Sequence, residues 1–169
     1  EGGHHVTLWA ETPQGYANLC RLLTEAHMGS ERGDTRLALP SLLELSEGLI
    51  LLSGCAQSPV AAAMRSSVAD GEAFTRKLLD VFGPGSMFME LQDNAVKGDP
   101  ARNKTLARLA GRMGLGVVAT SNVHYHRPER HRLQDVLVSI KNRATLDGAH
   151  GARRANKLFH LPDPWDLSH

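Results

Sequence analysis

The chain has 169 residues, 41% of them hydrophobic and 22% charged, with a formal net charge of +1. This composition is typical of one soluble globular domain, and the small net charge favours no particular partner. No apolar stretch approaches the roughly 20 residues of a membrane span, no signal peptide is present, and two cysteines make no disulfide framework, so we expect a cytoplasmic protein without membrane contact.

Four short apolar runs follow one another along the chain, each succeeded by helical periodicity. The first is residues 5–10. The pattern after it predicts a helix whose buried stripe contains Tyr16, Leu19, Cys20 and Leu23, which makes Cys20 a core residue. A polar loop at 29–34 and a short helix opening at Pro40 come next.

The second and third runs are residues 48–54 and 86–92. The second is apolar on both faces, as a covered parallel strand should be. Helices are expected from Pro59 and around Phe74–Val81. Asp99 and Pro100 then predict an N-cap and a first helical position, and the helix should bury residues 106, 109, 110 and 113.

The fourth run is residues 117–121, and a helix opening at Pro128 follows it. The periodicity predicts that this helix buries Leu133, Val136, Leu137 and Ile140. The alternation as a whole predicts an α/β fold with about four parallel strands, either a thin sheet or a partial (β/α) barrel. The open edges of such a sheet should be covered, for example by a second copy in a homo-oligomer.

Potential ligand groups gather where the fourth strand ends. Asn122, His124 and His126 lie there, and imidazoles two residues apart on an extended segment point to the same side. In parallel α/β proteins, ligands gather at the carboxyl ends of strands. The segment is therefore either a metal-binding edge or a polar strand end whose histidines form hydrogen bonds.

Three residues near other strand termini also carry possible chemistry. Cys55 follows the second strand and is either a metal ligand or a small buried apolar residue. Glu90, inside an apolar strand, suits a structural salt bridge or a catalytic role. His5 is either a ligand or an ordinary residue beside a strand.

Basic residues cluster after the fourth strand. They form either a face that contacts DNA phosphates or a solvated helix surface. The cluster consists of Arg127, Arg130, Arg132, Lys141 and Arg143, with Arg153 and Arg154 beyond it.

Taken together and in order, these segments resemble the PHP (polymerase and histidinol phosphatase) domain of bacterial C-family DNA polymerase III alpha subunits, closest to the error-prone branch. The resemblance rests on His5-Val-Thr-Leu8, Gln14-Gly-Tyr-Ala-Asn-Leu19, Glu47-Gly-Leu-Ile-Leu-Leu-Ser-Gly-Cys55, Glu90-Leu-Gln92, Ala119-Thr-Ser-Asn-Val-His-Tyr125, Asp135-Val-Leu137 and Thr145-Leu-Asp147. The segments 124–133 and 153–156 are those that resemble the error-prone branch.

The resemblance implies a distorted (β/α) barrel in which up to three metal ions support phosphoester hydrolysis, including 3′–5′ proofreading. It places metal ligands at His5, Cys55 and His124, and it places Asn122 at a position usually held by aspartate. The expected cofactor is zinc or manganese, either substoichiometric or absent, and the implied partners are DNA or polymerase and repair proteins.

Two departures limit the implied activity. The family's opening His-x-His segment and the ligands after it have no counterpart, and Asn122 supplies no carboxylate. The polymerase palm is also absent. We therefore expect a partial PHP domain over 1–147 with a tail at 148–169, acting as a truncated, degenerate scaffold in replication or translesion repair. The alternatives are a phosphoesterase completed by oligomerisation or a missing segment, and an accessory DNA-binding module.

Overall fold

The structure is a computed structural model that describes residues 3–31 and 33–163. It divides into two compact units, one comprising residues 1–90 and 106–118 (unit 1) and the other 91–105 and 119–169 (unit 2). Among the described residues, no helix combines the length and the apolar character that crossing a membrane requires.

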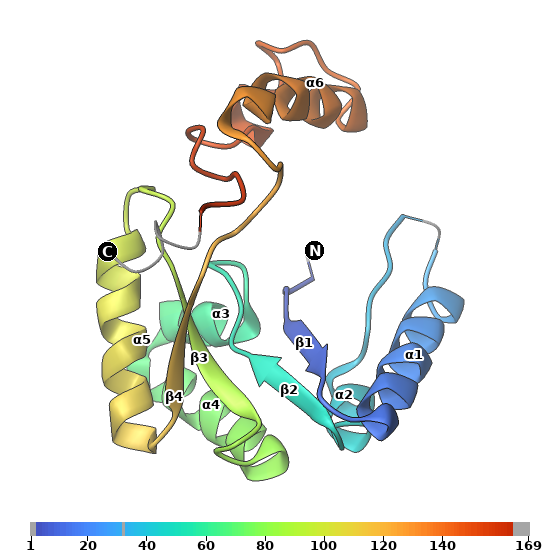
Figure 1. Cartoon of the computed structure of the whole chain (residues 1–169), viewed down its shortest axis with the longest axis vertical. Coiled ribbons are helices and arrows are strands. Elements are labelled where there is room, and N and C mark those ends of the chain that lie inside the picture. The colour runs from blue at the N-terminus through green and yellow to red at the C-terminus, as the bar shows by residue number, and fades with distance from the viewer. Residues whose placement is uncertain (1–2, 32, 164–169) are drawn as a thin grey trace. The chain divides into compact units, whose positions relative to one another are not determined.

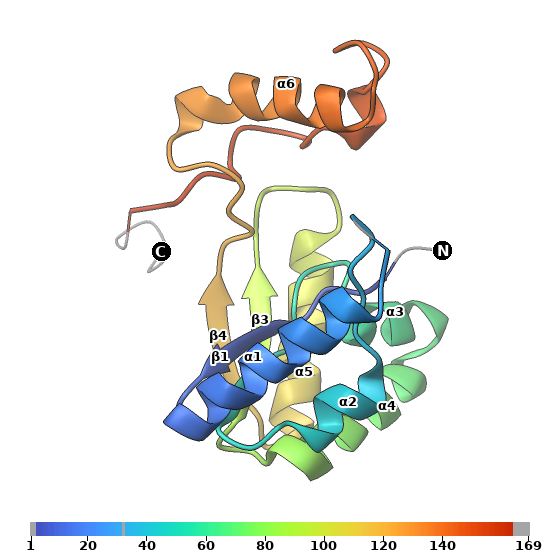
Figure 2. The ribbon, with the colours of Figure 1, turned by 90° about the vertical axis from the view of Figure 1, so that its right-hand side faces the viewer.

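A sheet of four strands lies mainly in unit 1, in the order β1-β2-β3-β4, with bounds Thr7–Ala10, Leu49–Leu52, Met87–Gln92 and Gly116–Thr120 (Figure 1). The last residues of β3 and β4 belong to unit 2. β2 and β3 are parallel, and the arrows of β3 and β4 run the same way in Figure 2. The predicted α/β class is confirmed and the sheet is mostly parallel, while closure into a barrel stays a prediction.

The first strand departs from the expected all-parallel arrangement, because β1 pairs antiparallel with β2, Thr7 opposite Leu52 and Ala10 opposite Leu49. The amide of Glu11 donates to the carbonyl of Gly48 at 2.9 Å, so the end of β1 is held to the start of β2. β1 and β2 therefore form an antiparallel pair whose connection contains two helices. An apolar run in a sequence carries no information about strand direction, which is why the pattern missed this pairing.

Helices cover the strands of unit 1. α1 (Pro13–Met28) packs on β1 and β2, α3 (Pro59–Ser66) packs on α4 (Val68–Phe82), and α4 contacts α2 (Leu39–Glu44) and β2. α5 (Asp99–Met113) begins in unit 2 and ends in unit 1. The core side chains with the lowest exposure come mostly from β2, β3 and these helices: Leu22, Leu49, Leu51, Leu52, Val60, Leu78, Met87, Met89 and Leu109.

The buried face of α1 is not the predicted one. Tyr16 is 65% exposed, Leu23 is 52% exposed and Cys20 is exposed, whereas the buried residues of this helix are Gly15, Asn18, Leu22 and Ala26. The Asn18 amide donates to the carbonyl of Glu47 at 3.0 Å, and Gly15 lies against Gly48. Gly15 and Asn18, a small and a polar residue, therefore make the contact with the start of β2, and hydrophobic periodicity does not register such a contact.

In unit 2, the apolar stripe of α6 (His131–Lys141) is exposed rather than buried as predicted. The exposed fractions are 51% for Leu133, 41% for Val136, 51% for Leu137 and 67% for Ile140. The buried apolar residues Tyr125, Ala149 and Phe159 gather elsewhere in the unit. Phe159 and His160, from the predicted tail, pair with this segment: Tyr125 and His160 form a parallel bridge, and the amide of His124 donates to the carbonyl of Phe159 at 2.8 Å.

Candidate functional site

The turn that follows β2 brings Cys55 to the segment that precedes β1. Gly54 has a φ of +86°, and a β-carbon placed there would lie 2.8 Å from the carbonyl oxygen of His5. Glycine is therefore needed at this position both for its backbone conformation and for the close approach. The amide of His5 donates to the carbonyl of Gln57 at 3.2 Å, which fixes the two segments side by side.

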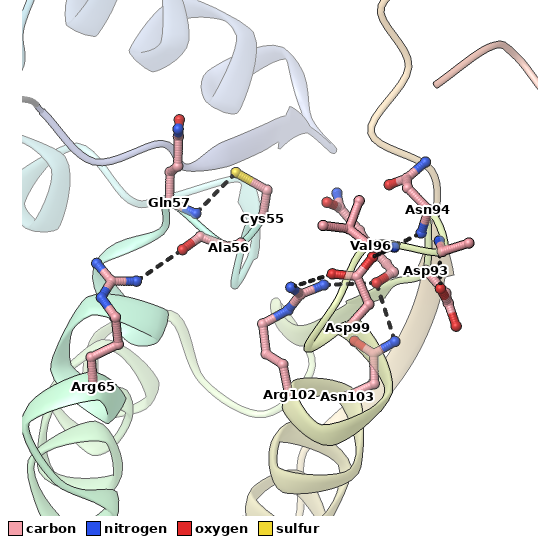
Figure 3. Close-up of polar contacts among 12 residues, drawn as sticks. Cys55, Ala56, Gln57, Arg65, Asp93, Asn94, Val96, Asp99, Arg102 and Asn103 are labelled. Carbon is pink, nitrogen blue, oxygen red and sulfur yellow. Dashed lines mark hydrogen bonds and ion pairs between the residues drawn. The ribbon is translucent and has the colours of Figure 1, made fainter. Parts of the chain in front are cut away.

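The predicted residues His5 and Cys55 are neighbours in this turn. The Sγ atom of Cys55 lies 3.7 Å from Nδ1 of His5, and the amide of Gln57 donates to the same sulfur at 3.4 Å. Figure 3 shows the amide of Gln57 directed at the sulfur, with Arg65 donating to the carbonyl of Ala56 at 3.0 Å. These hydrogen bonds hold the turn, and with it the sulfur, in place beside the imidazole.

The geometry of this pair suits one tetrahedral ion. Zinc bound to sulfur at about 2.3 Å and to nitrogen at about 2.0–2.1 Å holds the two ligand atoms roughly 3.5 Å apart, close to the 3.7 Å between Sγ and Nδ1. A thiolate with an imidazole suits zinc better than manganese, which prefers oxygen ligands. The pair fits half of a zinc coordination sphere. In neither unit do three or more His, Cys, Asp or Glu side chains gather within the described residues.

Asn122 and His124 lie in unit 2, after the end of β4, and both are partly buried. The ring of His124 packs against Phe159, with ring centroids 6.0 Å apart and planes at 57°. His126 is exposed, so the two histidines of this segment have different environments. His5 and Cys55 lie in unit 1, and Asn122 and His124 lie in unit 2. The structure brings His5 and Cys55 together, and the full set of four ligands that the resemblance implies stays a prediction.

A network in the loop between β3 and α5 was missed by the sequence reasoning. The carboxylate of Asp99 accepts hydrogen bonds from the amides of Asn94 at 3.0 Å and Val96 at 3.3 Å, and it pairs with Arg102 at 2.7 Å. Arg102 also donates to the carbonyl of Gln92 at 2.8 Å (Figure 3). Asp99 therefore orders the loop before its helix, where the sequence predicted only a helix cap.

These contacts determine the pKa of Asp99. Burial alone raises the pKa, but the amide of Asn94, the side chain of Arg102 and the amide of Val96 together outweigh burial and lower it below its ordinary value of 3.8. Asp99 is 5% exposed, so the ionised carboxylate is held inside the protein by its hydrogen bonds. The network is structural and contributes no free ligand group to a metal.

The predicted basic cluster lies on the short 3₁₀ helix η1 (Pro128–Arg130), on α6 and at their flanks. None of its members takes part in the ion pairs found among the described residues. Cations without acidic partners on a surface are available to phosphates. The five residues of the cluster, all exposed, are Arg127, Arg130, Arg132, Lys141 and Arg143.

Comparison with known proteins places these features in a family. Residues 1–94 match the family described as the PHP domain. The chain is 36% identical to an error-prone DNA polymerase of Symbiobacterium thermophilum over 97% of its length, and 38% identical to one of Mycolicibacterium paratuberculosis over 88%. It is 32% identical to DNA polymerase III subunit alpha of Thermus aquaticus over 99%. The chain spans only 14–17% of the length of these relatives.

Proposed function

Because this chain belongs to the PHP-domain family and is similar to error-prone and replicative DNA polymerase subunits, we propose that it is a scaffold segment of such a polymerase. In this proposal the segment holds a single metal ion and does not itself catalyse phosphoester hydrolysis. The observation that carries the proposal is the contact between His5 and Cys55.

The contact supports metal holding because a thiol and an imidazole are both zinc ligands, and the two atoms lie about as far apart as two ligands of one zinc ion. Cys55 is partly exposed and His5 is exposed, so burial of apolar area does not explain why they lie together. The amide of Gln57 donates to the same sulfur and so fixes its position beside the imidazole of His5. When bound, the ion would draw the segment before β1 and the turn after β2 together.

The predicted metal ligands argue against catalysis by this segment. Catalytic clusters that hydrolyse phosphoesters rely on metal ions that generate hydroxide and bridge the reacting oxygens. Asn122, at the position where the resemblance implies a carboxylate, is neutral and leaves the charge of an ion uncompensated. One ion with few ligands stabilises the fold, which is the role we propose.

Cobalt substitution tests the metal-holding role. A cobalt ion bound by Cys55 should give the thiolate charge-transfer absorption in the near ultraviolet, because the band requires a sulfur ligand. The band should persist in Cys20→Ser, which changes the other, exposed cysteine, and disappear in Cys55→Ser. A band that survives Cys55→Ser, or no band in the unaltered chain, would contradict the proposal.

The same samples test whether the segment is catalytic. We expect no release of nitrophenol from bis(nitrophenyl) phosphate, and no shortening of a 5′-labelled oligonucleotide, with zinc or manganese present. Turnover that disappears in both His5→Ala and Cys55→Ser would replace the scaffold proposal with the alternative of a metal-dependent phosphoesterase.

A further inference from the structure

The helix α6 turns its polar side towards its own unit and its apolar side outwards. Its less exposed residues are mostly polar and comprise His131, Gln134, Asp135, Val138 and Ser139. The exposed side carries an apolar stripe with i, i+3, i+4, i+7 spacing (the α6 stripe), which consists of Leu133, Val136, Leu137 and Ile140. A helix that stabilises only its own unit buries its apolar side. The α6 stripe is therefore a surface for another molecule to cover.

An ion pair holds α6 in this orientation. The carboxylate of Asp135, on the polar side, pairs at 3.4 Å with Arg153, which follows the 3₁₀ helix η2 (His150–Ala152). The side chain of Asp135 is 21% exposed and that of Arg153 is 24% exposed, so the pair is largely shielded from water. A rotation of α6 that buried the stripe would separate these charges and leave each one partly buried without its partner. The outward direction of the α6 stripe therefore follows from the packing of unit 2.

Cations flank the α6 stripe on both sides. Val136 and Leu137 form its two margins, because successive residues of a helix point about 100° apart. Arg132 lies one turn before Val136, and Lys141 lies one turn after Leu137, so each cation stands beside one margin. Both cations are exposed, and neither takes part in an ion pair among the described residues.

The acidic side chains of this segment do not cancel the two cations. Asp135 lies on the polar side of α6 and pairs with Arg153. Glu129 lies on η1, ahead of the stripe rather than on either side of it. These two carboxylates are outnumbered within residues 128–143 by the cations Arg130, Arg132, Lys141 and Arg143. The stripe therefore favours a partner that brings carboxylates to the margins of its own apolar surface.

The same charges argue against a second copy of this chain as the occupant. In an antiparallel pair of α6 helices, Arg132 of one copy would stand beside Lys141 of the other, and a parallel pair would place each cation beside its own equivalent. Like charges held close together are unfavourable. A polyanion would leave the stripe unexplained, because contacts with phosphates use no apolar surface. An apolar stripe between two cations is instead complementary to an amphipathic acidic helix.

We propose that α6 docks an amphipathic helix of a second protein, whose apolar residues cover the α6 stripe and whose Asp or Glu residues pair with Arg132 and Lys141. The spacing of the stripe is that of helices recognised through one apolar face, and two such helices pack side by side. The docking surface belongs to unit 2 alone. It is therefore independent of the metal-holding pair His5 and Cys55 in unit 1.

A synthetic peptide tests the proposal by fluorescence anisotropy with the full chain. The labelled probe has about 16 residues, enough to form a helix, with leucines in one stripe and glutamates on both sides of it. It should bind, and its affinity should fall as salt rises, because exposed charges are screened. A peptide with lysine for every glutamate, and one with the same residues in scrambled order, should each bind about tenfold more weakly or worse, since the first loses the charge match and the second loses the stripe.

Variants of the chain locate the docking surface. Leu137→Gln should weaken binding of the glutamate peptide about tenfold, because it removes an apolar anchor. Arg132→Gln should weaken it about two- to fivefold at low salt, the effect of one exposed ion pair. Leu23→Gln and Arg21→Gln on α1 are the matched controls, since Leu23 is 52% exposed beside 51% for Leu137, and Arg21 is exposed like Arg132. Both controls should leave the affinity unchanged, and thermal melting verifies that each variant is folded.

The outcomes separate the possible occupants. No binding of the glutamate peptide up to about 1 mM, equal affinity for the glutamate and lysine peptides, or equal affinity in Leu137→Gln and Leu23→Gln would overturn the proposal. So would a dimer in sedimentation analysis that Leu137→Gln converts to a monomer, or binding to phosphatidylglycerol vesicles that Leu137→Gln abolishes, because a second copy or a lipid surface would then be the occupant. Binding that weakens in Leu137→Gln and Arg132→Gln and is unchanged in Cys55→Ser supports the proposal and shows its independence from the metal.

Discussion

At the scale of single residues, Asp99 shows that a side chain predicted to cap a helix can instead hold the preceding loop. The dipeptide Asp99-Pro100 correctly predicted where α5 begins. The carboxylate nevertheless bonds to the amides of Asn94 and Val96, in the preceding loop, and to Arg102. Sequence patterns describe local spacing, and they could not reveal that the loop of residues 93–98 turns back onto this side chain.

Replacing Asp99 by asparagine should destabilise the protein by about 1–3 kcal/mol at pH 7, because Arg102 would then be left without its ion-pair partner. Asp80→Asn is a suitable control, since Asp80 is exposed on α4. Urea unfolding of the unaltered protein, Asp99→Asn and Asp80→Asn measures the difference in the free energy of unfolding. A loss no larger than that of Asp80→Asn would show that the network is unimportant for stability.

The effect should depend on pH in a defined direction. The pKa of Asp99 is lower in the folded state than the ordinary value of 3.8, so its contribution is fully present above that value and is lost as the pH falls through the lowered pKa. The difference between the unaltered protein and Asp99→Asn should therefore be constant from pH 5 to 7 and shrink below about pH 4. A difference that grows on acidification would contradict this assignment.

At the scale of elements, the contact between α1 and the start of β2 depends on two glycines. A β-carbon on Gly15 would overlap the carbonyl of Gly48, and Gly48 itself has a φ of +70°. Asn18, one turn further along α1, adds its hydrogen bond to Glu47. The helix can approach the strand closely only because neither glycine carries a side chain.

Gly15→Ala should destabilise the chain by several kcal/mol, since backbone must move to admit the methyl group. Gly111→Ala is a matched control on α5, where the added carbon meets open space. That change should stabilise the protein by up to about 1 kcal/mol, because alanine is the better helix former. Thermal unfolding distinguishes the two, and equal melting temperatures would refute the close contact.

The sequence predicted the positions of the elements better than their orientations. All four apolar runs are strands, and Pro40, Pro59 and Pro100 each open a helix as expected. The direction of β1 and the buried faces of α1 and α6 were wrong. The direction of a strand is decided by contacts such as the hydrogen bond between Glu11 and Gly48. Which face of a helix is buried is decided by neighbours far away in sequence. Hydrophobic periodicity contains neither kind of information.

At the scale of the whole molecule, the predicted metal ligands divide between the two units. His5 and Cys55 belong to unit 1, and their proximity could be foreseen only through the family resemblance, because fifty residues separate them. Asn122 and His124 belong to unit 2. The proposed role as a metal-holding scaffold thus rests on the pair in unit 1, and His124 remains a predicted third ligand.

The most direct test of this account is the metal content of the full chain, purified without chelator and measured by plasma emission. We predict up to about one zinc per chain, lost in His5→Ala, and lowered in His124→Ala but not in His126→Ala, which changes the neighbouring exposed histidine. Zinc retained in full by His5→Ala, or no zinc bound even when the metal is supplied, would contradict the proposed metal-holding scaffold.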